Sequence, residues 1–125
     1  MANIEASLQQ ARITDFQARV NLEREKTVLQ ANVSIQAKKP IDSDDLSGLL
    51  LFQAVISAEN KEEFYLSLTE ELIFEFSAKP ADFEAMIRDA CVPIAAQEVS
   101  ESIDGILKLM GNAPLNLNLN QARKR

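Results

Sequence analysis

Apolar side chains recur at every second position through the first part of the chain, and this alternation predicts β-strands. Residues 16–22 are apolar at even positions, and residues 29–37 are apolar at odd positions with only polar side chains between them. The second strand is expected to end at Lys39–Pro40, because proline has no N–H for a ladder. A third strand is expected over 49–58 and a fourth over 64–76. Four consecutive strands predict an antiparallel meander as the simplest arrangement.

The fourth predicted strand is the most regular. Its even positions are apolar except for one charged residue, Glu70. That charge predicts a bulge or a bend near Glu70–Glu71, or a glutamate that reaches the sheet edge. Several odd positions of the third and fourth strands are apolar as well: Leu49, Leu51, Val55, Tyr65 and Ile73. This surplus predicts either a second face buried in an oligomer or a groove for extended, nonpolar polypeptide, and the sequence leaves both open.

Helical spacing replaces the alternation after Pro80. Asp82 is expected to cap a short helix that Pro93 ends or kinks, and a longer helix follows from about residue 94. Gly111 is expected just past the end of that helix. The last apolar segment, 115–120, alternates leucine with asparagine, which fits either a fifth strand or an extended arm over a groove.

A chain of 125 residues is long enough for one hydrophobic core and too short for two. We therefore expect a single α+β domain over residues 1–125, with flexible ends at 1–10 and 121–125. No segment approaches the ~20 uninterrupted apolar residues of a membrane helix, and the N-terminus does not resemble a secretory signal. A cytoplasmic protein is expected. The lone cysteine, Cys91, is expected in the core and fits a reducing compartment.

The charge distribution argues against nucleic acid and membranes as partners. The net charge is −6, and setting aside the +3 of Arg123–Arg125 leaves −9 on residues 1–122. An acidic body repels polyanions. Three basic residues at a chain end are typical of a solvated terminus, so no function is assigned to them.

The residues that carry common catalytic chemistry are missing. The sequence has no histidine and one cysteine, which argues against zinc sites and against Ser–His or Cys–His nucleophiles. Adjacent carboxylates at Asp44–Asp45, Glu62–Glu63 and Glu70–Glu71 would point to opposite faces of a strand, so they are poor partners for one reaction centre. The turn 42–45 resembles part of a calcium loop but lacks its glycine and its closing glutamate. We expect no enzyme, no cofactor and no metal site.

The order of four strands, short helix, proline, long helix and leucine-rich extension resembles the SecB family of export chaperones. The likeness is most specific in EFYLSLTEELIFEF, residues 63–76, where Ile73 and Phe74 match the family's Ile–Phe pair, and in GNAPLNLNLN, residues 111–120. The segment VPIAAQEVSESIDGILKLMG, residues 92–111, matches the proline that opens the family's long helix. Its length is closer to the short SecB-like domains of Gram-positive bacteria.

The resemblance implies a four-stranded antiparallel sheet with a short and a long helix packed on one face, assembled as a dimer or a tetramer. It also implies an ATP-independent holdase that binds non-native polypeptides in hydrophobic grooves, near the sheet and under the segment after the last helix. The implied peptide contacts in this chain are Tyr65, Ile73, Leu115, Leu117 and Leu119. Ser67 stands where the family carries an acidic residue that docks on the translocase motor, and the end QARKR replaces an acidic, metal-associated tail. Both departures count against docking on that motor.

Two classes of function remain open. One is a holdase for unfolded or secretory chains, acting in protein export or for a dedicated client such as an antitoxin. The other is a non-catalytic oligomeric adaptor or assembly protein of phage or plasmid origin. Its surplus apolar surface would be used up by self-association or by one folded partner.

Overall fold

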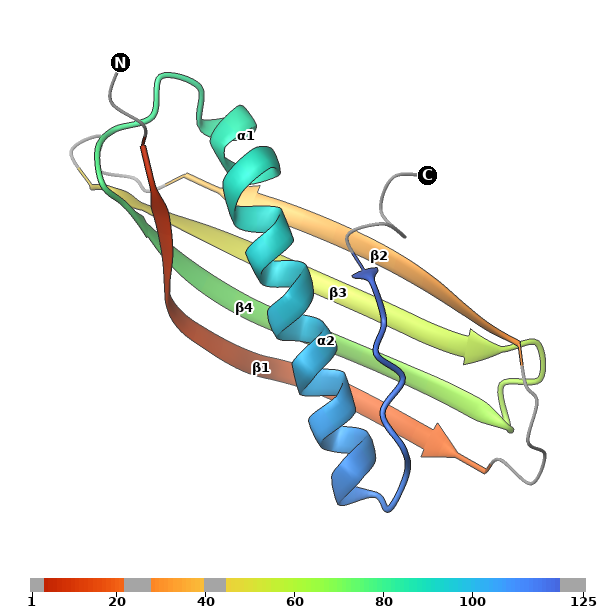
Figure 1. Ribbon diagram of the computed structural model, residues 1–125. Helices are drawn as coiled ribbons and strands as arrows, with labels where there is room; N and C mark the ends of the chain where they lie inside the picture. Colours follow the sequence, from red (N-terminus) through yellow and green to blue (C-terminus); the bar gives the residue numbers. More distant parts are fainter. Residues whose placement is uncertain (1–3, 22–27, 40–44, 120–125) are drawn as a thin grey trace.

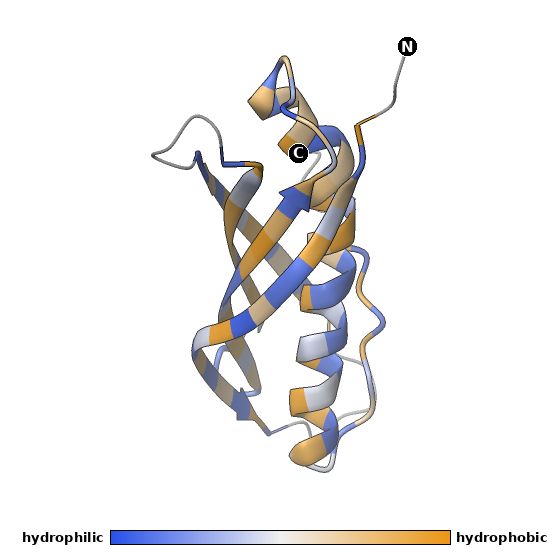
Figure 2. Cartoon of the chain, turned by 90° about the vertical axis from the view of Figure 1, so that its left-hand side faces the viewer, coloured by the Kyte–Doolittle hydropathy of each residue, from blue (hydrophilic) through white to orange (hydrophobic). Residues whose placement is uncertain are grey.

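The structure, a computed structural model, describes residues 4–21, 28–39 and 45–119. Four strands are followed by a helical segment that has three parts (Figure 1). The elements in chain order are β1 (Ala6–Val20), β2 (Leu29–Lys38), β3 (Ser47–Ala58), β4 (Phe64–Phe76), α1 (Phe83–Met86), the π-helical turn η1 (Ile87–Cys91) and α2 (Val92–Leu109). The helical segment lies on one face of the sheet (Figure 2), which confirms the predicted α+β class.

The strands form one antiparallel sheet in the order β1-β4-β3-β2, so the predicted meander is wrong. β2, β3 and β4 follow one another as expected, but β1 pairs with the far side of β4. The two most apolar strands, β3 and β4, thereby become central. The more polar β1 and β2 form the edges, where charged and polar residues are tolerated.

β1 begins at Ala6, well before the position at which regular alternation starts in the sequence. Its pairing with β4 shifts by one residue between Leu8 and Gln10 and again between Ile13 and Asp15. Each shift moves the inward side chains from even to odd positions or back, so no single period describes the strand. This is why the alternation identifies only its second half.

β1 also includes part of the N-terminal segment that was expected to be flexible. Residues 6–10 belong to β1, and Ala6 lies opposite Phe76 at the end of β4. Residues 1–3, and the C-terminal segment 121–125 that was also expected to be flexible, lie outside the described residues.

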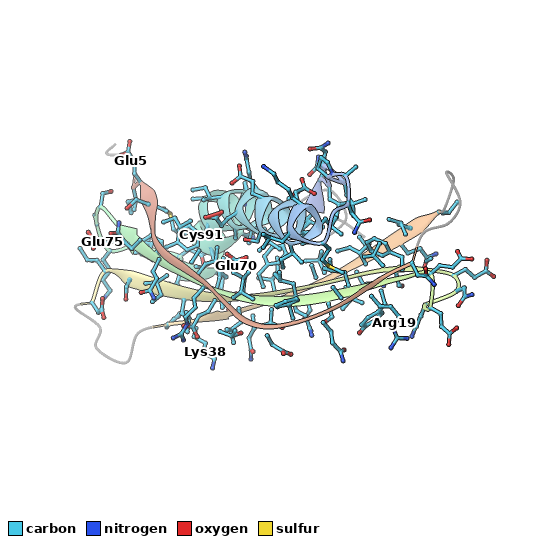
Figure 3. The ribbon with its side chains drawn as sticks, turned by 90° about the horizontal axis from the view of Figure 1, so that it is seen from below. Glu5, Arg19, Lys38, Glu70, Glu75 and Cys91 are labelled. Atoms are coloured by element: carbon cyan, nitrogen blue, oxygen red, sulfur yellow. The ribbon has the colours of Figure 1, made fainter. Side chains whose placement is uncertain are left out.

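The irregularity expected near Glu70–Glu71 lies in the neighbouring strand instead. β4 is continuous, and the second register shift of β1, between Ile13 and Asp15, falls beside Glu70. Glu70 therefore keeps the inward orientation of its alternation. It lies between the sheet and α2 with only 2% of its surface exposed (Figure 3), and it does not reach the sheet edge.

The core lies between the inward face of β3 and β4 and the helix α2. Both strands contribute their even positions, and α2 contributes residues three and four apart. Cys91 is fully buried in this cluster, which confirms its predicted place in the core. Burial of large apolar side chains, roughly 1.5–3 kcal/mol each, is the main favourable term holding the helix on the sheet. The largest fully buried side chains include Phe52, Phe64, Phe74, Leu66, Leu72 and Ile103.

The helical segment begins and ends at residues that the sequence identifies. Asp82 accepts a hydrogen bond from the backbone N–H of Ala85 at 3.1 Å and caps α1. Pro93 does not end the helix: it lies in the first turn of α2, directly after η1, where its missing N–H is tolerated. Gly111 follows α2 with φ of 82°, and its N–H donates to the carbonyl of Lys108 at 3.0 Å.

The leucine–asparagine segment is extended but is not a fifth strand. Residues 115–119, called the arm below, run back along α2 on the side that faces away from β1 (Figure 1). The arm pairs with none of the four strands described. Within the described ranges, no helix is both long enough and apolar enough to cross a membrane.

Candidate functional site

Tyr65 and Ile73 share a face of the sheet but do not form one site. Both are half-buried on the outward face of β4, opposite the helical segment. Lys38 and Arg19 project from this outward face in Figure 3. Eight residues along a strand separate the Cα atoms of Tyr65 and Ile73 by about 26 Å. The odd positions of β4 between them are polar, so no apolar side chains of this strand connect Tyr65 with Ile73. Tyr65 lines a separate cavity of about 480 Å³.

The arm leucines point inward. Leu119 is 1% exposed and belongs to the buried core cluster, while Leu115 and Leu117 are half-buried and pack against that cluster. Asn116 and Asn118 are exposed between them. The arm therefore presents one apolar edge to the protein and one polar edge to solvent. Its leucines, as the structure places them, are not an open contact surface.

Two side chains of α2 bind the backbone of the arm. The N–H of Leu115 donates to Oδ1 of Asp104 at 2.8 Å, and the hydroxyl of Ser100 donates to the carbonyl oxygen of Leu117 at 2.9 Å. Asn116, between these two anchored residues, has φ of 52°, a left-handed conformation in which regular strand pairing is impossible. A cavity of about 490 Å³ remains between the arm and α2.

A larger cavity, about 600 Å³, lies between the edge strand β2 and the helical segment. We call it the β2–α1 groove. Its walls are the half-buried inward side chains of β2 and apolar side chains from α1, η1 and the start of α2. The apolar residues that line it are Val33, Ile35, Ala37, Phe83, Ile87 and Val92.

The wall of the β2–α1 groove that Phe83 forms is held in place by aromatic packing. The rings of Phe76 and Phe83 meet edge to face with centroids 6.2 Å apart. Gly48 makes room for them, because a Cβ at this position would stand 3.1 Å from Phe76 and 3.3 Å from Phe83. The ammonium group of Lys39 lies 5.6 Å from the centre of the Phe83 ring, at the rim of the groove.

The rim of the β2–α1 groove is charged, with Lys39 and Arg88 as cations and Glu84 as an anion. A hydrogen bond with Asp89 and the charge of that carboxylate raise the pKa of Arg88, which stays positive at any physiological pH. An apolar trough with a mixed-charge rim suits a polypeptide with apolar side chains and a polar backbone better than a small charged metabolite.

The β2–α1 groove is not evident from the sequence. Its β2 wall is visible in the sequence as the apolar odd positions of 29–37, but alternation alone does not reveal that β2 is an edge strand. Because β1 pairs with β4 and not with β2, β2 lies at the edge of the sheet, and its apolar side chains are only partly covered by the helical segment.

Glu70 is a buried carboxylate with incomplete hydrogen bonding, since its Oε1 has no partner among the described residues. Burial raises the pKa of Glu70 above the ordinary value of 4.5, a hydrogen bond with Ser102 acts in the opposite direction, and the charge of Glu98 raises it further. Neither Glu70 nor Glu98 lines the two cavities described above. Glu70 and Glu98 are therefore not a pair of catalytic carboxylates exposed at either cavity.

The remaining reactive groups are dispersed or covered. Burial raises the pKa of the Cys91 thiol to about 11, so the nucleophilic thiolate is scarce at neutral pH. Across residues 4–21, 28–39 and 45–119, no three acidic or cysteine side chains gather at a distance that would hold a metal ion.

Comparison with known proteins gives a match to the fold. No family model matches the sequence, and no curated protein matches it. Among solved structures, the chain is similar to Rv1957, a SecB-like chaperone of Mycobacterium tuberculosis, in complex with a ChAD peptide from the antitoxin HigA1 (Rv1956). The TM-score is 0.67 at 12% identity, over 90% of this chain and 86% of that chain. This chain therefore has the fold of a SecB-like chaperone.

Proposed function

We propose that this protein is an ATP-independent holdase that binds extended apolar segments of non-native polypeptides. The β2–α1 groove is the observation that carries the proposal, because it combines an apolar trough with an adjacent free strand edge. The fold that the chain shares with a SecB-like chaperone supports it. The proposal assigns the protein no catalytic step and no cofactor.

The groove suits an extended chain for two reasons. Val33, Ile35 and Phe83 are only half-buried, so a bound apolar side chain would remove further apolar surface from water. β2 is an edge strand, and the backbone groups on its outer edge have no partner strand within the described sheet. Polypeptides bind such edges by adding a strand, whatever their exact sequence.

We favour a dedicated client over general export. One solved protein with this fold forms a complex with a peptide from an antitoxin. In addition, Ser67 replaces the acidic residue that the export chaperone uses to dock on the translocase motor, and Ser67 lies on the outward face of β4. A client that needs no handover to that motor is consistent with this replacement.

We further propose that copies of the chain associate through β1, as a dimer or as a tetramer built from dimers. β1 is the other edge strand, 15 residues long. Two large apolar side chains on it are well exposed, Ile13 at 39% and Phe16 at 51%. Long edges with exposed apolar residues favour edge-to-edge association. The adaptor function would use this same surface, with a folded partner in place of a client.

The test is suppression of aggregation of a chemically unfolded client at equimolar ratios, without ATP. The matched variants are Ile35→Ser, on the inward face of β2 in the groove, and Ile73→Ser, on the outward face of β4; both isoleucines are half-buried. We expect the wild type and Ile73→Ser to suppress aggregation and Ile35→Ser to lose at least half of the effect. If the wild type forms a stable oligomer but does not suppress aggregation of the client, the holdase proposal fails and the adaptor function is favoured.

A further inference from the structure

We propose that the arm occupies the surface of α2 on which clients bind, called the client track below. Clients are extended segments with an apolar residue at every second position, and they displace the arm from α2. This inference rests on the proposed function. It assigns a role to Ser100 and Asp104 as the pair that binds the backbone of whichever extended segment lies along α2.

The spacing of Ser100 and Asp104 fits an extended backbone. Four residues on a helix lie on one face and rise about 6 Å. Two residues of fully extended chain advance by about 6.6 Å, and the arm advances somewhat less from Leu115 to Leu117, because Asn116 between them is left-handed with φ of 52°. Asp104 accepts from the N–H of Leu115, and Ser100 donates to the carbonyl of Leu117 two residues later. Asp104 thus accepts from a backbone N–H, and Ser100 donates to a backbone carbonyl two residues later. The chain that carries both groups runs antiparallel to α2.

These two bonds carry no sequence information. Every non-proline residue offers the same N–H and carbonyl groups. A client that follows the same path also needs a residue that tolerates the left-handed conformation of Asn116, such as asparagine, aspartate or glycine. Ser100 is 8% exposed beneath the arm, and Asp104 is partly buried. Polar groups in such positions are usually hydrogen-bonded in folded proteins, and here the arm supplies their partners.

Specificity comes from the side chains of the arm. Leu115, Leu117 and Leu119 face the core, while Asn116 and Asn118 face solvent. A segment that replaces the arm must therefore place apolar side chains at alternate positions and tolerate polar ones between them. That is the pattern of an amphipathic strand before it has paired, which is a common form of non-native polypeptide.

The arm also points toward the open groove. It passes Asp104 first and Pro93 last, and Leu119 and Pro93 line the same cavity. The next residue back along α2, Val92, lines the β2–α1 groove. A client that replaces the arm and continues in the same direction would reach that groove, whereas the sequence after Leu119 reads NQARKR and offers only Ala122 as an apolar side chain.

The first test loosens the arm and leaves α2 intact. In Leu115→Asn/Leu117→Asn, the probe is a labelled synthetic peptide that alternates leucine and asparagine, and binding is measured by fluorescence anisotropy. If the arm covers the track in 90–99% of molecules, releasing it should tighten peptide binding by about 10- to 100-fold. The control is Leu109→Asn, because Leu109 is 89% exposed on α2; its affinity should equal that of the wild type.

The second test addresses the pair on α2. In the background of Leu115→Asn/Leu117→Asn, Ser100→Ala/Asp104→Ala should weaken peptide binding by about tenfold, as expected for the loss of two hydrogen bonds of modest net strength. A peptide of the same composition with its leucines adjacent should bind at least tenfold more weakly than the alternating peptide. Far-UV circular dichroism and thermal melting check that each variant is folded. If the arm variants unfold, competition by excess synthetic arm peptide, residues 113–119, against the labelled peptide on the wild type replaces them.

The outcomes separate this inference from the proposed function. Binding that is unchanged or weaker in Leu115→Asn/Leu117→Asn overturns the arm as a competitor but leaves the holdase standing. Failed competition by the arm peptide, or equal affinity for the alternating and adjacent-leucine peptides, does the same. If no variant and no wild type binds either peptide or an unfolded client, the proposed function itself fails.

Discussion

Glu70 of β4 lies opposite Ile13 of β1, next to the second register shift of that strand, and its Oε1 has no hydrogen-bond partner among the described residues. The apolar neighbour across the ladder offers no compensation for the carboxylate charge. Burial raises the pKa of Glu70 above 4.5 for this reason, and Glu98 adds to the effect while Ser102 opposes it.

The raised pKa of Glu70 predicts the direction of pH dependence. The folded state holds its proton more tightly than the unfolded state, so this contribution to stability is complete below about pH 4.5 and is lost as the pH rises through the folded-state pKa. We expect Glu70→Gln to raise the free energy of unfolding at pH 8 by roughly 1 kcal/mol, because the amide has nearly the same shape but carries no charge to desolvate. Urea denaturation at pH 5 and pH 8 measures it.

Glu71→Gln is the control for that substitution. Glu71 lies one residue away on the outward face, where its Oε1 accepts a hydrogen bond from Arg12 at 2.9 Å, and the Arg12 side chain is 60% exposed. Such a surface pair contributes about 0–1 kcal/mol, so Glu71→Gln should be neutral or slightly destabilising. A lower free energy of unfolding for Glu70→Gln at pH 8 would contradict this prediction. It would mean that the Glu70 carboxylate makes hydrogen bonds that offset the cost of burying its charge.

The glycines of the helical segment predict opposite effects of alanine. Gly105 lies inside α2, and a Cβ there would meet no atom within 4 Å. Gly105→Ala should therefore raise the free energy of unfolding by about 0.5–1 kcal/mol. Gly111 has φ of 82°, so Gly111→Ala should lower it by about 1 kcal/mol through backbone strain. Chemical denaturation of both variants measures these changes. If Gly111→Ala raises the free energy of unfolding as Gly105→Ala does, α2 does not end at Gly111.

The burial of the arm predicts a contrast between two leucines. Leu119 is 1% exposed in the core cluster, and Leu109 is 89% exposed on α2. Leu119→Ala should cost about 1–3 kcal/mol, limited by the docking free energy of an arm that covers the track in 90–99% of molecules. Leu109→Ala should change stability by less than about 0.5 kcal/mol. A small effect of Leu119→Ala would mean that the arm does not pack on the core in solution.

The exposed edge of β1 predicts the assembly. Replacing Phe16 by serine should shift the protein from an oligomer to a monomer in sedimentation velocity at micromolar concentration. It should leave the melting temperature of the monomer nearly unchanged, because Phe16 is 51% exposed. The control is Tyr65→Ser on the outward face of β4. An oligomer that survives Phe16→Ser and dissociates with Tyr65→Ser would place the interface on the outward face.

Much of the fold follows from the alternation of apolar residues. Strands β2 to β4, the cap at Asp82 and the helix end at Gly111 are where the sequence predicts them. The first half of β1 is not, because its two register shifts change the inward positions from even to odd and back. The strand order also escapes prediction. Alternation fixes which side chains face the core but not which strand stands beside which.

The candidate site follows from the sequence only in part. The resemblance indicates the leucines of the arm, and the structure places them against α2. The resemblance also indicates Tyr65 and Ile73, and the structure places them about 26 Å apart on the other face of the sheet. The β2–α1 groove and the pair Ser100–Asp104 depend on contacts between segments distant in the sequence, such as Asp104 with Leu115. Helical periodicity marks Ser100 as an inward position and gives no sign that its partner is a backbone carbonyl.

The most direct test of the central claim is the position of a bound client. Amide chemical-shift changes or hydrogen-exchange protection, measured with and without an extended apolar peptide, report that position residue by residue. We predict changes at Val33, Ile35 and Phe83, together with loss of protection at the Leu115 amide, whose N–H donates to Asp104, as the arm leaves. Changes confined to Tyr65 and Ile73 on the outward face, or no change at all, would contradict the account.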